Sequence, residues 1–152
     1  MKTAQQWFDE YAVSHQNKTN KAIHYICVPA IFFSVIGLLF SIPTTFLENT
    51  IGLYNPFLEN WATMVTVLIL FFYLRLGFWY FINMFLVTAL SIVGNYWLSG
   101  VGNLALISLA IFVIAWIGQF YGHKVEGKKP SFIKDLQFLL IGPLWVLKKL
   151  GR

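Results

Sequence analysis

The chain has 152 residues, of which 58% are hydrophobic and only 11% are charged, and its formal net charge is +5. A soluble domain carries about 25% charged residues and could not bury this much apolar surface at this length, so an ordinary soluble protein is excluded. The composition instead predicts a single integral membrane domain over 1–152, and the basic residues flank apolar segments in a way that does not indicate a nucleic-acid partner.

Residues 4–16 have the pattern of a short amphipathic helix. Trp7, Phe8 and Tyr11 recur at helical spacing, and acidic residues fall elsewhere on the surface of the helix. We expect this helix to lie along the membrane surface, before a polar stretch that leads into the first span.

Four apolar segments follow, and each is read as a transmembrane helix, over 22–42, 57–74, 76–98 and 103–122. A loop over 43–60 separates the first two spans. Arg75 lies between the second and third spans, where it marks either a tight hairpin at the membrane surface or a charge inside the membrane. We favour the hairpin, because a buried arginine is costly and its long side chain can reach the interface.

The last apolar stretch, 136–147, is too short to span a membrane and is interrupted by Gly142 and Pro143. We therefore expect an interfacial or re-entrant helix over about 131–149. Taken together, the segments predict an all-α fold. It is a polytopic membrane four-helix bundle with an N-terminal amphipathic helix and a C-terminal interfacial or re-entrant helix.

The basic residues indicate the orientation of the chain in the membrane. With four spans, all eleven Lys and Arg residues fall on the side that holds both termini and the Arg75 turn. The positive-inside rule then places both termini in the cytoplasm. The membrane would be the inner membrane in a bacterium or the endoplasmic reticulum in a eukaryote.

Small and polar residues within the spans predict how the helices pack. Gly118 and Gly122 form a small-xxx-small pattern that lets the fourth helix approach a neighbour closely. Asn83 and Asn95 lie in the third span and are expected to form hydrogen bonds between helices.

Three histidines, His15, His24 and His123, all map to the cytoplasmic boundary of the predicted spans. The first and last helices of a four-helix bundle are commonly adjacent, so these imidazoles are expected to come together. Three neutral imidazoles can bind zinc or iron and leave positions open for a substrate. The alternative is that the three are interfacial histidines without a shared ligand.

Other polar residues extend this candidate site. Glu126 follows His123 by three residues, and two histidines with Glu126 would match the facial arrangement of non-haem iron oxygenases. Asn20 lies one helical turn before His24, and Gln119 one turn before His123. Either side chain is a candidate to orient an imidazole.

Two stretches of the sequence, one near each end, resemble the yeast 2-hydroxy-fatty-acid dioxygenase family, which was formerly a domain of unknown function. They are His15-x4-Asn20-x3-His24-x4-Pro29 and Trp116-Ile-Gly-Gln119-Phe120-Tyr-Gly122-His123-x2-Glu126-x3-Pro130. The similarity covers essentially the whole chain, and the two stretches together are fairly specific.

The resemblance implies an enzyme, an iron(II)-dependent dioxygenase that removes one carbon from 2-hydroxy fatty acids by α-oxidation. It implies that His15, His24 and His123 bind Fe2+ at the cytoplasmic membrane boundary, with His24 and His123 essential for catalysis. Zn2+ is a possible substitute for the iron in a purified sample. The substrates would be a 2-hydroxy fatty acid and O2, with membrane lipid around the protein.

This chain departs from the family pattern at two places. The family's glutamate follows the histidine by four residues rather than three, which puts Glu126 in doubt as a metal ligand. The segment after Pro143 also lacks an acidic residue that the family pattern contains. Lys21 or Lys124 would pair with the substrate carboxylate. The alternative for each lysine is that it only sets the orientation of the chain in the membrane and attracts lipid headgroups.

Two other classes of function remain open from the sequence. One is a non-catalytic lipid-binding or scaffolding membrane protein, in which the histidines would be dispensable. The other is a small transporter, which is disfavoured because no charged residue lies well inside the spans apart from Arg75. The sequence gives neither the preferred acyl length nor the oligomeric state.

Overall fold

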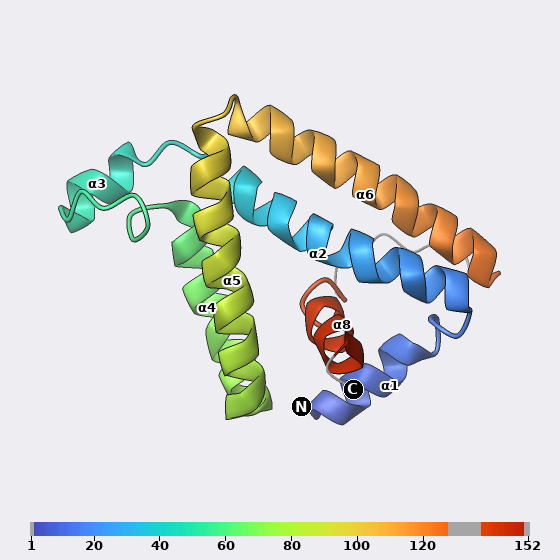
Figure 1. Cartoon of the computed structure of the whole chain (residues 1–152). Helices are drawn as coiled ribbons and strands as arrows, with labels where there is room; N and C mark the ends of the chain where they lie inside the picture. Colours follow the sequence, from blue (N-terminus) through green and yellow to red (C-terminus); the bar gives the residue numbers. More distant parts are fainter. Residues whose placement is uncertain (1, 128–137, 151–152) are drawn as a thin grey trace. The chain divides into compact units, whose positions relative to one another are not determined.

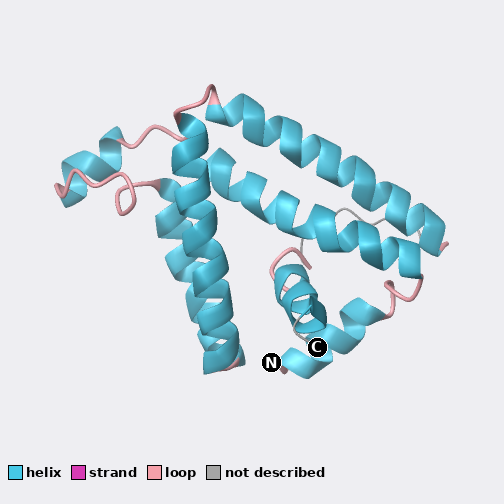
Figure 2. Cartoon of the chain, in the orientation of Figure 1, coloured by secondary structure: helices cyan, strands magenta, loops and turns pink. Residues whose placement is uncertain are grey.

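The structure is a computed structural model that describes residues 2–127 and 138–150. Every regular element in these residues is a helix, so the all-α prediction is confirmed (Figure 2). The helices are α1 (Ala4–Ala12), α2 (Lys18–Phe40), α3 (Thr45–Ile51), α4 (Trp61–Leu76), α5 (Phe78–Ser99), α6 (Leu104–Glu126) and α8 (Gly142–Leu150) (Figure 1).

Three of these helices, α2, α5 and α6, are long and apolar enough to cross a membrane. The remaining predicted span corresponds to α4, which has 16 residues and is therefore about 24 Å long, less than the roughly 30 Å of a bilayer core. It begins later than predicted because the Asn60 side chain caps it, accepting a hydrogen bond of 2.8 Å from the Thr63 amide. The arrangement of the spans as a four-helix bundle stays a prediction.

The chain forms two compact units, and α2 and α6 each contribute residues to both. Unit 1 consists of Met1–Phe32 and Ile111–Arg152, and unit 2 consists of Phe33–Ala110. All three histidines belong to unit 1. The prediction of one integral membrane domain over 1–152 stays a prediction.

In unit 2, α4 and α5 form a hairpin around Gly77. The φ angle of Gly77 is +141°, a backbone conformation that favours glycine, and this permits an abrupt reversal between the two helices. Arg75 is exposed in the last turn of α4. The hairpin predicted at Arg75 is therefore confirmed, whereas its position at the membrane surface stays a prediction.

Two asparagines of α5 were expected to join helices, and the structure separates their roles. The Asn95 amide donates to the main-chain oxygen of Phe33 at 3.1 Å, so it links α5 to α2 within unit 2. Asn83 instead donates at 2.8 Å to Trp79 in its own helix. Within the described residues, only Asn95 forms the predicted bond between helices.

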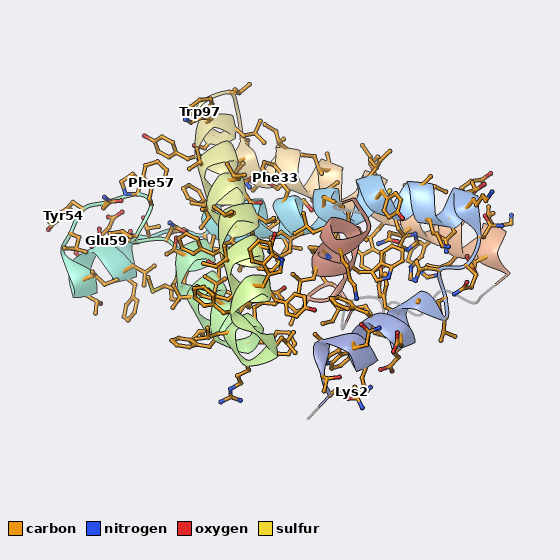
Figure 3. All side chains as sticks on the ribbon, turned by 60° about the horizontal axis from the view of Figure 1, so that its bottom comes forward. Lys2, Phe33, Tyr54, Phe57, Glu59 and Trp97 are labelled. Carbon is orange, nitrogen blue, oxygen red and sulfur yellow. The ribbon has the colours of Figure 1, made fainter. Side chains whose placement is uncertain are left out.

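The segment between α2 and α4 contains the short helix α3, although the sequence predicted only a loop there. The following loop is held by Glu59, which is labelled in Figure 3 and is only 2% exposed. Its carboxylate accepts hydrogen bonds from the main-chain amides of Leu53 at 2.6 Å and Asn55 at 2.9 Å. A buried carboxylate thus satisfies main-chain donors that would otherwise be unpaired.

In unit 1, the first helix ends earlier than the predicted 4–16. α1 begins with a capping box between Thr3 and Gln6, and it buries Ala4, Phe8 and Tyr11 along one side. At the other end of the chain, α8 begins at Gly142, where the sequence indicated a break. Of the predicted helix over about 131–149, residues 131–137 lie outside the described residues, and residues 138–141 form turns instead of helix.

Candidate metal centre

His15 is positioned by the end of α1. Its ring stacks on Tyr11, with ring centroids 4.0 Å apart and planes inclined by only 10°. The Nδ1 atom of His15 lies 2.6 Å from the main-chain oxygen of Tyr11, one helical turn earlier. The ring is therefore fixed on one face by an aromatic side chain and at one nitrogen by a carbonyl.

His24 lies within α2 and is held in the same way. Its Nδ1 atom is 2.9 Å from the main-chain oxygen of Asn20, again one turn earlier. A carbonyl oxygen can only accept, so in both residues Nδ1 carries a proton, and in the neutral ring Nε2 then carries the lone pair. This tautomer is the one in which Nε2 can bind a metal ion.

His123, near the end of α6, completes a compact cluster with the other two rings. The ring centroids are 4.2 Å apart for His15 and His24, 5.1 Å for His24 and His123, and 5.6 Å for His15 and His123. All three residues are at most 3% exposed. The prediction that these imidazoles approach each other is confirmed.

The donor set of this cluster fits a metal ion. One ligand nitrogen from each histidine lies within 4.8 Å of the others. Nitrogen atoms bound to one ion at about 2.1 Å are roughly 3 to 3.5 Å apart, so the three ligand atoms would have to move closer together around a bound ion. Three neutral, buried imidazoles suit zinc or iron(II) and leave further positions for other ligands.

Glu126 lies outside the three-histidine group and contacts the segment that carries His15. Its carboxylate accepts hydrogen bonds from the main-chain amides of Gln16 at 2.8 Å and Asn17 at 2.9 Å, and from the Asn20 side chain at 2.9 Å. Glu126 therefore joins the end of α6 to the start of α2. A role as a metal ligand stays a prediction.

Asn20 connects several parts of the site. It is fully buried, and its side-chain amide donates to the Ser14 main-chain oxygen at 3.0 Å as well as to Glu126. Its own main-chain oxygen contacts the His24 ring. Asn20 thus links the polypeptide before α2, the end of α6 and one histidine.

The close contact between α2 and α6 requires glycine (Figure 1). A Cβ atom on Gly122 would lie 2.4 Å from Asn20 Oδ1, and one on Gly118 would lie 2.6 Å from Cys27 Sγ. Both distances are shorter than any van der Waals contact allows. The small-xxx-small prediction is confirmed, and it places His24 next to the helix that carries His123.

Gln119 lies one turn before His123 on α6 and is only 6% exposed. It borders a small cavity of about 10 Å³, which is about the space of one water molecule. Much of the remaining wall is apolar. The lining includes Tyr11, His24, Val28, Ile31 and Trp116.

The two candidate substrate-binding lysines differ in position. Lys21 is half-buried and lies three residues before His24, on the same side of α2. Lys124 directly follows His123 and is exposed. Neither side chain forms a hydrogen bond or ion pair with another residue in 2–127 or 138–150.

Two aromatic residues that cover His15 were not predicted from the sequence as parts of the site. Tyr11 precedes His15 by four residues, so helical spacing contained a signal for it. Trp145 of α8 is 2% exposed, and its ring centroid lies 5.6 Å from that of His15. It comes from a distant part of the sequence and carried no comparable signal.

The structure thus combines helices that are long and apolar enough to cross a membrane with a buried cluster of three histidines. These two features define a membrane-type helical protein with a candidate metal centre. The chain belongs to the Mpo1-like family: the family model described as 2-hydroxy-palmitic acid dioxygenase Mpo1-like matches residues 1–152. This match confirms the family resemblance of the sequence. Neither the curated proteins nor the solved structures give a match to the chain.

Proposed function

We propose that this protein is an iron(II)-dependent dioxygenase that removes one carbon from 2-hydroxy fatty acids. The observation that carries the proposal is the buried cluster of His15, His24 and His123, whose ligand atoms lie within 4.8 Å of one another. The name of the family supports the substrate class. The site would lie at the cytoplasmic boundary of the membrane, with both termini in the cytoplasm.

In this proposal, the three histidines hold Fe2+. Bound iron(II) supplies the one-electron and O2 chemistry that protein side chains do not provide. The reaction converts one 2-hydroxy acid and one O2 into CO2, water and an acid that is one carbon shorter. The bond between C1 and C2 of the substrate breaks, and C2 becomes the new carboxyl carbon.

The polypeptide contributes orientation and exclusion of water. The main-chain oxygens of Tyr11 and Asn20 accept from Nδ1 of His15 and His24, which would leave the Nε2 atom of each ring available to hold the metal. Burial of the three rings limits access of bulk water. Lys21, on the same side of α2 as His24, would pair with the substrate carboxylate, and Lys124 would do so from α6.

The alternative is a non-catalytic lipid-binding or scaffolding protein with a histidine cluster of no catalytic importance. Metal content and activity, measured together, separate the two functions. Purified protein reconstituted with Fe2+ should consume O2 in the presence of 2-hydroxypalmitate and release the acid that is one carbon shorter. Palmitate provides the matched control substrate, because it lacks only the 2-hydroxyl group.

Substitution of the histidines tests their assigned roles. His24→Ala and His123→Ala should each abolish turnover and lower the bound iron to a small fraction of that in the unmodified protein. Circular dichroism should show that the helices persist. If either variant turns over 2-hydroxypalmitate at the rate of the unmodified protein, the proposed catalytic centre is wrong.

A further inference from the structure

The side chain of Gln119 is buried without a hydrogen-bonding partner among the described residues. Its Oε1 atom is fully enclosed and accepts no hydrogen bond from any residue in 2–127 or 138–150. Burial of an unpaired amide is unfavourable by about 1–3 kcal/mol, so such groups in proteins usually meet a water molecule or a ligand. The Gln119 amide is therefore in a position to receive a small polar group.

The neighbouring cavity limits what that group can be. It is bordered by Gln119 and His24 and has a volume of about 10 Å³, which accommodates one water-sized group. Val28, Ile31 and other apolar residues line much of it. The volume excludes an acyl chain and also a carboxylate group, because each is larger than one water molecule. A single hydroxyl group fits the volume and can donate to an amide oxygen.

The cavity also lies where the head of the substrate is expected. Gln119 is one turn from His123 on α6, and His24 of α2 forms part of the cavity wall. Two of the three cluster residues are therefore adjacent to the amide. A hydroxyl group in the cavity would be next to the position of a metal ion held by the histidines.

We propose that Gln119 is the residue that selects 2-hydroxy fatty acids, by accepting a hydrogen bond from the substrate's 2-hydroxyl group in the cavity beside His24. This inference rests on the proposed function. A fatty acid without the hydroxyl would leave the buried amide unpaired, and it would therefore bind less tightly. Gln119 thus contributes substrate specificity, while the histidines bind the metal.

The test compares the binding of 2-hydroxyoctanoate and octanoate, which are short enough to remain in solution. Dissociation constants are measured by calorimetry without O2, on the full-length, metal-loaded protein in detergent. The unmodified protein should prefer the 2-hydroxy acid, and Gln119→Met should reduce this preference by about tenfold, a typical effect of one hydrogen bond in a buried site. Metal content should not change.

Two further variants make the result specific. Gln5→Met makes the same chemical change on the exposed surface of α1 and should leave the preference unchanged. Gln119→Glu retains oxygen acceptors, so it should weaken the binding of both acids by repulsion but keep the preference for the 2-hydroxy acid. If Gln119→Glu keeps the preference that Gln119→Met loses, the preference arises from hydrogen-bond acceptance by the side chain and not from packing.

An unchanged preference in Gln119→Met overturns the inference, and it leaves the proposed function intact if the protein still turns over 2-hydroxypalmitate. Loss of metal in Gln119→Met also overturns it, because Gln119 would then act through His123. If the unmodified protein binds no metal and turns over no 2-hydroxy acid, the proposed function itself fails.

Discussion

Replacing Glu126 with glutamine alters the contact between the end of α6 and the segment that carries His15 and His24. The two carboxylate oxygens accept three hydrogen bonds, from the Gln16 amide at 2.8 Å and from the Asn17 amide and Asn20 side chain at 2.9 Å each. The glutamine amide keeps one oxygen and places an NH2 group against donors. At least one hydrogen bond to a charged acceptor is therefore lost.

The expected consequence is weaker metal binding. A hydrogen bond to a charged group contributes about 1.5–3 kcal/mol when buried, and partial exposure of Glu126 reduces this to roughly 1–2 kcal/mol. The loss allows the His15 segment to move relative to His123. Groups that support metal ligands in this way typically change metal affinity by about 10- to 100-fold. We expect Glu126→Gln to fall in this range.

The assay is a titration with Co2+, whose absorption spectrum reports coordination, together with hydrogen exchange at the Gln16 and Asn17 amides. A matched control is Glu59→Gln, which alters a buried carboxylate that also accepts from two main-chain amides but lies in unit 2. Glu59→Gln should lower stability and leave Co2+ affinity unchanged. The reasoning is refuted if Glu126→Gln binds Co2+ within twofold of the unmodified protein, or if both variants weaken binding equally.

Three further predictions concern packing, metal and topology. Gly122→Ala places a Cβ atom 2.4 Å from Asn20 Oδ1 and should destabilise the protein by about 1–3 kcal/mol in thermal unfolding, whereas Gly102→Ala, with its nearest contact at 3.6 Å, should have little effect. A chelator that removes bound metal should lower the unfolding temperature, because a ligand present at 100 times its Kd stabilises a protein by about 2.7 kcal/mol. An unchanged midpoint of thermal unfolding would argue against a fold that is stabilised by metal. In a variant without the native cysteine, a membrane-impermeant thiol reagent applied from outside should label Thr50→Cys but not Lys2→Cys, and the reverse pattern would contradict cytoplasmic termini.

The long helices and the histidine cluster followed from local and periodic features of the sequence, whereas the short helix α3 was not predicted. Long uncharged stretches predicted α2, α5 and α6, and the glycine spacing on α6 predicted its close contact with α2. His15, His24 and His123 were placed at one boundary by the positions of the predicted spans. These features depend on residues that are close in sequence or on the simple rule that adjacent helices can share a site.

Other features depended on contacts that the sequence does not encode in a local pattern. The early end of α1 follows from the turn at 13–17, where Glu126 pairs with main-chain amides from a distant part of the chain. The position of Trp145 near His15 likewise requires α8 to pack against α1. The contacts of Glu126 with the main-chain amides of Gln16 and Asn17 also join residues that are far apart in the sequence, so no local pattern indicated them.

The histidine cluster has a consequence for how the protein is made. His15 and His24 leave the ribosome long before His123, and the covering residue Trp145 follows later still. A nascent chain that contains only the first two histidines has an incomplete set of metal ligands, and these ligands are exposed. If the cluster binds a metal as proposed, stable loading requires synthesis of the later helices, and metal retention can then serve as a measure of complete assembly during biogenesis.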